Sequence, residues 1–168
     1  MDFKTLLPNF DAVKKTDWAK PQLNVDTKDP FRLVMLAGAV LMLVFVFLPW
    51  ITVTASASSS LGQAGSVATK TLGIATWYGF FAFLCAAVAI VGALYKHTEL
   101  AFCAAVLGVL FGLLGVMISP DVANAEAEVS VGGYSAKAKT TVGHLGAILY
   151  LVATVVTAAA AYLKITKK

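Results

Sequence analysis

Residues 31–53 read FRLVMLAGAVLMLVFVFLPWITV, and this stretch decides the fold of the chain. No charged residue follows Arg32 within it, and the apolar run ends at Pro49 and Trp50. The residues that follow alternate between apolar and hydroxyl side chains, as in Ile51-Thr52-Val53-Thr54. Because about twenty apolar residues cross a bilayer as a helix, the stretch predicts a membrane span that continues into a β-strand.

The composition of the whole chain supports this interpretation. The protein has 168 residues, of which 59% are hydrophobic and 13% are charged, and its mean hydropathy is +0.81. In soluble domains, about a quarter of the residues are charged. The formal net charge is +4, but the basic residues are scattered and flank the apolar blocks. We therefore expect a polytopic membrane protein, with membrane lipid and no nucleic acid as a partner.

Four apolar segments predict four transmembrane helices, and none has Asp, Glu, Lys or Arg in its interior. The predicted spans cover about 33–50, 77–95, 100–119 and 143–163. The predicted fold is a four-helix transmembrane bundle of the membrane all-α class, formed by residues 31–168. Residues 1–30 lack the apolar core of a signal peptide and form a tail, which is either solvated or includes a short interfacial helix at 9–18.

The distribution of Lys and Arg orients the bundle. Six of them lie in the tail and at its junction with the first span, one lies in the short link 96–99, and three lie at the C-terminus. The two longer loops, 51–76 and 120–142, contain three together. Ten against three places both termini and the short link in the cytoplasm, and the two longer loops outside.

Both outer loops have the alternating pattern of β-strands. In the first loop, residues 51–58 alternate, a turn follows around Gly62 to Gly65, and residues 66–72 form a return strand. In the second loop, Gly132-Gly133 suits a two-residue hairpin turn between strands 126–131 and 134–139. This turn fixes a register with two pairs of opposite charge on one face and only apolar pairs on the other. The charge pairs are Glu128 with Lys137 and Glu126 with Lys139.

Because an isolated hairpin is only marginally stable, we expect the strands of both loops to form one small extracytoplasmic antiparallel sheet. We expect residues 51–57 to lie beside the hairpin of the second loop. The apolar side chains of the hairpin's inner face are expected to cover the outer ends of the helices.

Two further groups of residues are candidates for interactions. Trp50 and Trp77 occupy the predicted outer interface, where amphipathic aromatic rings are enriched. Gly108 and Gly112 form a GxxxG motif in the third span. Such small-residue faces let helix backbones approach closely, either within one bundle or between subunits.

The sequence offers little for catalysis. His97 and His144 are predicted on opposite sides of the membrane and cannot share a metal ion. Cys85 and Cys103 are predicted at different depths and serve as packing residues. No Ser/His/Asp set, phosphate loop or HExxH motif is present, and no carboxylate lies in a span. We expect no enzymatic activity, no cofactor and no metal site.

The layout resembles the claudin-type tetraspan architecture over roughly residues 31–168. It shares four spans, cytoplasmic termini, a first outer loop that opens directly after the first helix, and strands in both outer loops. The claudin first loop has a Trp-containing motif and a cysteine pair, whereas here Trp50 and Trp77 stand alone and the loop has no cysteine. The missing cysteines, the absence of an N-x-[ST] acceptor and the Ala/Gly-rich spans indicate a bacterial protein of the cytoplasmic (inner) membrane.

These observations favour a structural or scaffold protein that self-assembles laterally, or an accessory subunit of a larger membrane complex. Its outer β-loops and small-residue helix faces would make the contacts, because strand edges invite pairing with a neighbour. The alternative is a component of a channel or transporter.

Overall fold

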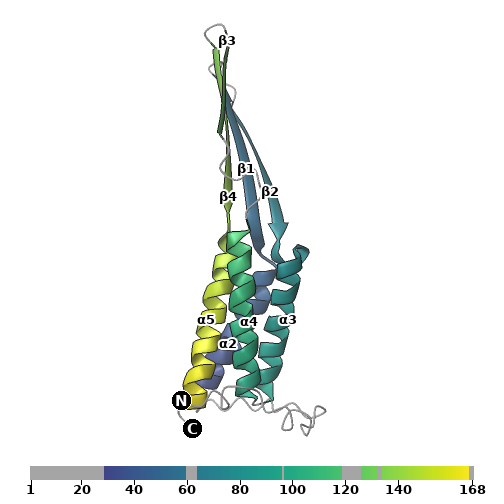
Figure 1. The fold of residues 1–168 in the computed structure, drawn as a ribbon, viewed down its shortest axis with the longest axis vertical. Coiled ribbons are helices and arrows are strands. Elements are labelled where there is room, and N and C mark those ends of the chain that lie inside the picture. Colours follow the sequence, from purple (N-terminus) through teal and green to yellow (C-terminus); the bar gives the residue numbers. More distant parts are fainter. Residues whose placement is uncertain (1–28, 60–63, 96, 119–125, 132–133, 167–168) are drawn as a thin grey trace.

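The computed structural model describes residues 29–59, 64–95, 97–118, 126–131 and 134–166. Four helices run side by side, and a β-sheet extends from one end of them (Figure 1). The start of α2 and the end of α5 lie at the end of the bundle opposite the sheet. The short helix predicted at 9–18 lies outside the described residues.

The helices are α2 (Pro30–Val46), α3 (Trp77–Leu94), α4 (Thr98–Met117) and α5 (Leu145–Thr166). The last three are long and apolar enough to cross a membrane, whereas α2 is a shorter apolar helix of 17 residues. Two helix starts have a side-chain N-cap. Asp29 accepts a hydrogen bond from the backbone N–H of Arg32, and Thr76 accepts one from that of Gly79.

Two predicted helix limits differ from the structure. The first predicted span extended to residue 50, but α2 ends at Val46. Pro49 explains the difference, because proline has no backbone N–H and disfavours helical backbone at the residue before it. The fourth predicted span began at residue 143, but Gly143 still pairs with Thr52 in the sheet, so α5 starts two residues later.

The sheet has four antiparallel strands in the order β2-β1-β4-β3. They are β1 (Pro49–Ser59), β2 (Ala64–Leu72), β3 (Glu126–Val131) and β4 (Tyr134–Gly143). A short 3-10 turn, η2 (Gly73–Ala75), connects β2 to α3. The pairing of β1 with β4 confirms that the two loops form one antiparallel sheet, with the first strand beside the hairpin.

The predicted register of the β3–β4 hairpin is confirmed. Glu128 pairs with Lys137 and Glu126 pairs with Lys139, while Val129 pairs with Ala136. Lys137 Nζ lies 3.2 Å from Glu128 Oε1, and the two side chains are 64% and 56% exposed. The turn residues Gly132 and Gly133 lie outside the described residues.

The sheet does not cover the helix ends, so this prediction is wrong. The sheet instead continues in the direction of the helices and stands as a single layer (Figure 1). The reason lies in the connections, because only two residues separate α2 from β1 and only His144 separates β4 from α5. With such short links, the two central strands prolong α2 and α5 and cannot fold back over the bundle.

The exposed ion pair of the hairpin gives the first testable prediction. Lys137→Glu places like charges opposite each other and should raise amide hydrogen exchange in β3 and β4 by roughly two- to fivefold, because an exposed pair contributes about 0.2–1 kcal/mol. Glu128→Lys combined with Lys137→Glu should restore part of the protection. A double variant no better than the single one would contradict a direct Glu128–Lys137 contribution.

Candidate functional site

Trp50 is the largest fully buried side chain among the described residues. In the β1–β2 ladder, Pro49 faces Leu72 and Ile51 faces Thr71, so Trp50 is an extra residue in β1. Such a bulge changes the direction of a side chain relative to the regular alternation of a strand. The bulge here directs the indole into the bundle, where it joins the core cluster at the sheet end of the helices.

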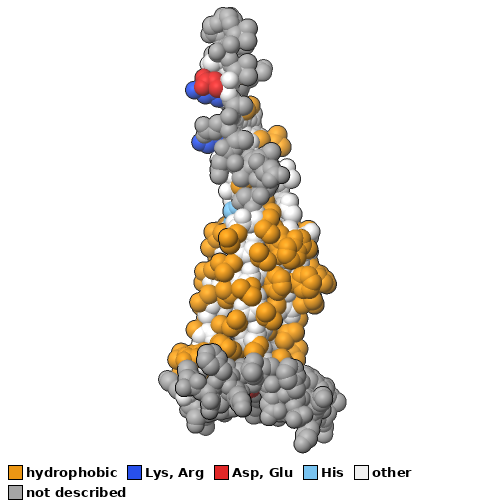
Figure 2. Space-filling view, viewed as in Figure 1, with side chains coloured by type: hydrophobic (Ala, Val, Ile, Leu, Met, Phe, Trp, Pro, Cys, Tyr) orange, Lys and Arg blue, Asp and Glu red, His pale blue; other side chains and the backbone are white. Residues whose placement is uncertain are grey.

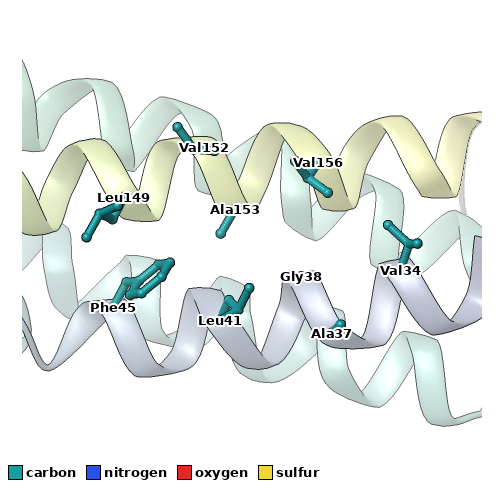
Figure 3. Close-up of a pocket in the computed structure, with 9 residues that line it drawn as sticks. All are labelled: Val34, Ala37, Gly38, Leu41, Phe45, Leu149, Val152, Ala153 and Val156. Carbon is teal, nitrogen blue, oxygen red and sulfur yellow. The ribbon is translucent and has the colours of Figure 1, made fainter.

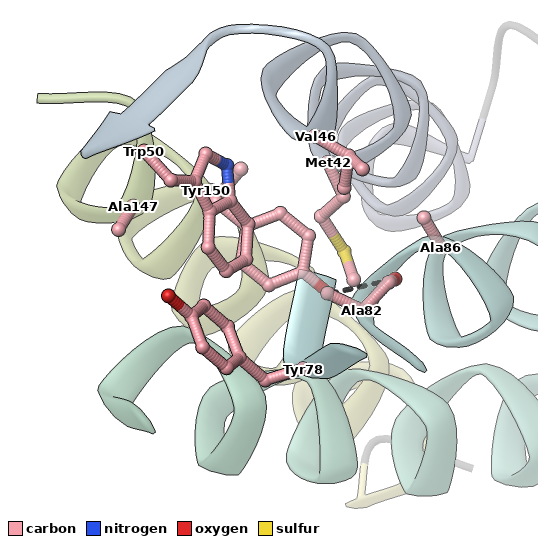
Figure 4. Packing of buried hydrophobic residues seen from close by; sticks show 9 residues of the cluster. Met42, Val46, Trp50, Tyr78, Ala82, Ala86, Ala147 and Tyr150 are labelled. Atoms are coloured by element: carbon pink, nitrogen blue, oxygen red, sulfur yellow. Dashed lines mark hydrogen bonds between the residues drawn. The ribbon is translucent and has the colours of Figure 1, made fainter. Parts of the chain in front are cut away.

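The indole of Trp50 contacts three helices, α2, α3 and α5. Its Nε1–H donates a hydrogen bond to the Phe45 carbonyl oxygen at 2.9 Å, in the last turn of α2. Its ring lies 6.0 Å from the ring of Tyr78 in a stacked arrangement and 5.1 Å from that of Tyr150 (Figure 4). Aromatic pairs of this kind are worth about 0.5–1.5 kcal/mol beyond the area they bury. Trp50 thereby joins α2, α3 and α5 where the sheet begins.

Three glycines make room for this side chain. A methyl group on Gly115 of α4 would lie 2.6 Å from Trp50 Cε3, and one on Gly146 of α5 would lie 2.5 Å from the Pro49 carbonyl oxygen. A methyl group on Gly73 would overlap Trp50 Nε1. These contacts are shorter than any real Cβ contact, so the absence of a side chain is what lets the elements close around the indole.

The GxxxG motif packs inside the chain. Tyr150 of α5 lies against it and donates its hydroxyl hydrogen to the Ala82 carbonyl oxygen at 2.9 Å (Figure 4). A methyl group on Gly108 would lie 3.0 Å from the Tyr150 hydroxyl, and one on Gly112 would lie 3.2 Å from Tyr150 Cδ1. Both glycines are buried. Of the two uses left open by the sequence, the structure therefore favours packing within one bundle over contact between subunits.

The two predicted interface tryptophans have different environments. Trp77 begins α3 and is 60% exposed, as an interface position requires. Trp50 is fully buried, and its single polar atom is already used by Phe45. Trp50 is therefore an internal anchor and offers no surface for a partner, in contrast to its predicted role.

A second anchor lies at the opposite end of the bundle. Arg32 is 3% exposed, and its Nε and Nη2 donate hydrogen bonds to the carbonyl oxygens of Ala93 and Leu94 at 3.1 and 3.0 Å. These carbonyls belong to the last turn of α3, where helices have unpaired acceptors and partial negative charge. The guanidinium thus caps α3 from α2.

An ion pair beside Arg32 joins α2 to α5. Lys164 Nζ lies 2.6 Å from Asp29 Oδ2, and Asp29 Oδ1 caps the start of α2. The hydrogen bond from Lys164 is the main reason that the pKa of Asp29 is lower than usual, with help from the backbone N–H of Arg32 and against the effect of burial. The pair is only partly buried, so its contribution to stability is modest.

The sheet presents two chemically different faces, which the register defines. The apolar face contains Ile51, Val53, Ala55, Ala57, Gly65, Val67, Ala136, Ala138 and Val142, with Ser59, Thr69, Thr71 and Thr140 among them. The polar face contains Thr52, Thr54, Ser56, Ser58, Ser66, Lys70, Glu128, Lys137, Lys139 and Thr141, with Ala68 among them. No charged residue of the described strands lies on the apolar face.

The apolar face is open to solvent along much of its length. Val67 is 70% exposed, and Ala55, Ala57, Ala136 and Ala138 are exposed as well. The described helices contact the sheet near the bundle, α4 and α5 through β1 and α2 and α3 through Trp50. No described element packs against the apolar face beyond that point.

A groove runs between α2 and α5 on the outside of the bundle. Its volume is about 360 Å³, and its floor includes Gly38 and Ala153 (Figure 3). The remaining lining is hydrocarbon from Val34, Ala37, Leu41, Phe45, Leu149, Val152 and Val156. This lining suits an acyl chain or an apolar helix and offers no polar side chain to a hydrated solute.

Groups suited to redox or metal chemistry are sparse in the part of the chain that the structure describes. The two cysteines are Cys85 in α3 and Cys103 in α4, and each is partly buried in its helix. Within the described ranges, no three His, Cys, Asp or Glu side chains gather in a way that could hold a metal ion.

Comparison with known proteins gives no match: no protein-family model, no curated protein and no solved structure matches the chain significantly. The structure defines the class of protein as a bundle of four apolar helices with a small antiparallel sheet at one end. No family or structure match confirms the claudin-like layout that the sequence predicts.

Sequence reasoning missed both anchors. It counted Arg32 only as a positive charge. It placed Trp50 at the outer interface, as part of the hinge between helix and sheet, and did not predict its burial. A signal for the first was available, because Arg32 directly precedes the apolar residues of the first span, and an arginine at the edge of such a segment needs acceptors. The bulge at Trp50 has no local signal of its own, since it depends on the register of β1 against β2.

Steric closure around Trp50 gives a second prediction. Gly115→Ala should lower the free energy of unfolding by about 1–3 kcal/mol, because its methyl group would overlap the indole. Gly65→Ala is the matched control and should be neutral, since a Cβ there meets open space. In a Trp50→Ala background the cost of Gly115→Ala should largely disappear, as measured by denaturation in detergent.

Asp29 gives a third prediction. Its lowered pKa means that its stabilising contribution is fully present above the usual aspartate value and is lost as the pH falls through the lowered value. Asp29→Asn keeps a good N-cap but removes the charge. Wild-type thermal stability should therefore fall more than that of Asp29→Asn between about pH 6 and about pH 2. Equal pH profiles would show that the Lys164 contact adds nothing.

Proposed function

We propose that this protein is a non-enzymatic integral membrane protein that crosses the bilayer four times and assembles laterally through its projecting sheet. In this role it serves as a structural or scaffold protein, or as an accessory subunit of a larger membrane complex. The proposal rests mainly on one observation, the single-layer sheet whose apolar face has no layer against it among the described elements. A sheet with one apolar face is normally stabilised by burying that face against another element.

The surface of the bundle supports the membrane assignment. On the face shown in Figure 2, hydrophobic side chains cover the helices, whereas Lys and Glu appear on the sheet. Large apolar side chains on several helices point outward, including Val44, Leu110 and Val152, each about half exposed. Contiguous apolar surface of this extent is typical of contact with lipid.

The short helix α2 is compatible with a fourth span. Its 17 residues give a length of about 26 Å at 1.5 Å per residue, and Phe47 and Leu48 extend the apolar segment beyond it. A hydrocarbon core is about 30 Å thick, and small mismatches are accommodated at modest cost. The groove between α2 and α5 then faces lipid, whose acyl chains match its lining.

We propose a bacterial inner-membrane location with the sheet outside. Arg32 and Lys164 lie at the end of the bundle opposite the sheet, which agrees with the excess of basic residues in the terminal segments. The claudin-like layout has the same orientation. The alternative of a channel or transporter finds little room in a single bundle, because the described core is filled by Met42, Trp50 and Tyr150.

A mass measurement tests the proposal. The full-length protein is extracted from its native membrane directly into nanodiscs, and native mass spectrometry or mass photometry gives the number of copies and any other subunit. We expect two or more copies, or a stable complex with another protein. A clean monomer across lipid compositions and protein concentrations would overturn lateral assembly.

A further inference from the structure

We propose that the apolar face of the sheet packs against the same face of a second copy of this chain, so that two single-layer sheets form one two-layer sandwich outside the membrane. This inference rests on the proposed function and specifies its contact surface. It replaces pairing through the strand edges with contact through a sheet face. The two-fold axis of the pair runs along the membrane normal.

The size of the face is sufficient for a stable contact. The four strands contain 11, 9, 6 and 10 residues. Each strand residue occupies about 16 Å² of sheet plane at a rise of about 3.3 Å and a strand spacing of about 4.8 Å, so one face measures roughly 570 Å². Two copies would bury roughly 1,100 Å², which reaches the size of about 1,000 Å² expected for a specific interface.

The chemistry of the face favours an identical partner. A two-fold contact brings each patch onto its own copy, so a charge on the patch would meet a like charge across the axis. The apolar face has no charged residue in the described strands, whereas the polar face has both signs, with Glu128, Lys70, Lys137 and Lys139. The small side chains Ala55, Ala57 and Ala138 at its centre permit close approach of two sheets.

The fold also places the two faces at the same height. The central strands β1 and β4 continue α2 and α5 with short links, so the bundle sets the position of the sheet relative to the membrane. Two copies inserted in the same orientation therefore present the same face at the same level. Confinement to the membrane plane lowers the entropic cost of bringing them together.

Single-cysteine crosslinking tests which face is buried. In a background with Cys85→Ala and Cys103→Ala, Ala55→Cys, Ala57→Cys and Ala138→Cys introduce thiols on the apolar face. Ser56→Cys and Ser58→Cys are matched controls, because they neighbour the first two positions in β1 but lie on the polar face. A bis-maleimide that spans about 10 Å, the usual distance between packed sheets, is added to intact membranes.

At least one apolar-face variant should give about tenfold more crosslinked dimer than either control, because only thiols on the buried face lie within reach of the crosslinker. Dimers that form equally from both faces would overturn the proposal. The same holds for dimers that form only from β2 positions such as Val67→Cys and Ala68→Cys, since they would indicate pairing through the β2 edge.

A charge substitution provides an independent measurement. Val67→Glu places a carboxylate on the apolar face and should weaken self-association in nanodiscs by at least about tenfold, because each dimer would bury two like charges. Ala68→Glu adds the same charge to the polar face of the same strand and should leave the copy number unchanged. Both positions are exposed in the single chain, so neither variant disturbs its fold.

The outcomes separate this inference from the proposed function. Wild-type copies that associate, with no preference for apolar-face crosslinks and no effect of Val67→Glu, would overturn the sandwich and leave lateral assembly in place. A complex with one copy of this chain and a different protein, in which Val67→Glu releases that protein, would also overturn it. A wild-type monomer would overturn both.

Discussion

Trp50 lies where α2 has just ended and the sheet has just begun, and its indole is held there by one hydrogen bond and two aromatic rings. Without the bulge between Pro49 and Ile51, the regular alternation of the strand would set the direction of this side chain. The bulge turns it into the bundle, and the glycines of η2, α4 and α5 allow those elements to close around it. The height of the sheet above the helices depends on this contact, because β1 cannot shift along its ladder without removing the indole from its site.

The bundle around this anchor places small residues inside and large ones outside. Along α3 the buried side chains include Ala82, Ala86 and Ala89, while Phe80 and Leu84 are exposed. In water, this pattern would leave large apolar side chains exposed to solvent. Between helices in lipid, however, association gains little from hydrophobicity and depends on close packing. With the proposed membrane location, the same requirement for close packing explains why Tyr150 of the same chain packs against Gly108 and Gly112.

The sequence predicted the parts of the structure whose physics is local. Four apolar blocks gave four helices, and the alternation of residues 51–58 gave β1. The hairpin register followed from a two-residue turn and from Glu128 opposite Lys137, since a shift by one residue would exchange the faces. These features depend on spacing within one segment.

The parts that were missed depend on contacts between segments. The bulge at Trp50 is decided by the pairing of β1 with β2, and the burial of Arg32 is decided by carbonyl oxygens of α3. The end of α2 is the exception, because Pro49 lies three residues further along the same segment. The direction of the sheet was mispredicted because the length of a connection, and not the pattern of a strand, decides whether a sheet folds back. The motif of Gly108 and Gly112 was ambiguous for the same reason, since close helix approach has the same sequence signature within a chain and between chains.

Burial along β1 falls with distance from the bundle, and this gradient shows which part of the sheet has the fewest stabilising contacts. Trp50 is buried, residues 51–54 are partly buried, and residues 55–58 are exposed on both faces. Near the bundle, the strands gain from packing against α4 and α5. Farther away, the described contacts are the ladder, the exposed Glu128–Lys137 pair and a hydrogen bond from Ser56 to the Lys139 carbonyl oxygen. Ladder hydrogen bonds replace bonds to water and contribute little net free energy each. The far half of the sheet is therefore the part that gains most from a second layer, and its alanine-rich apolar face is the surface on which that layer can pack.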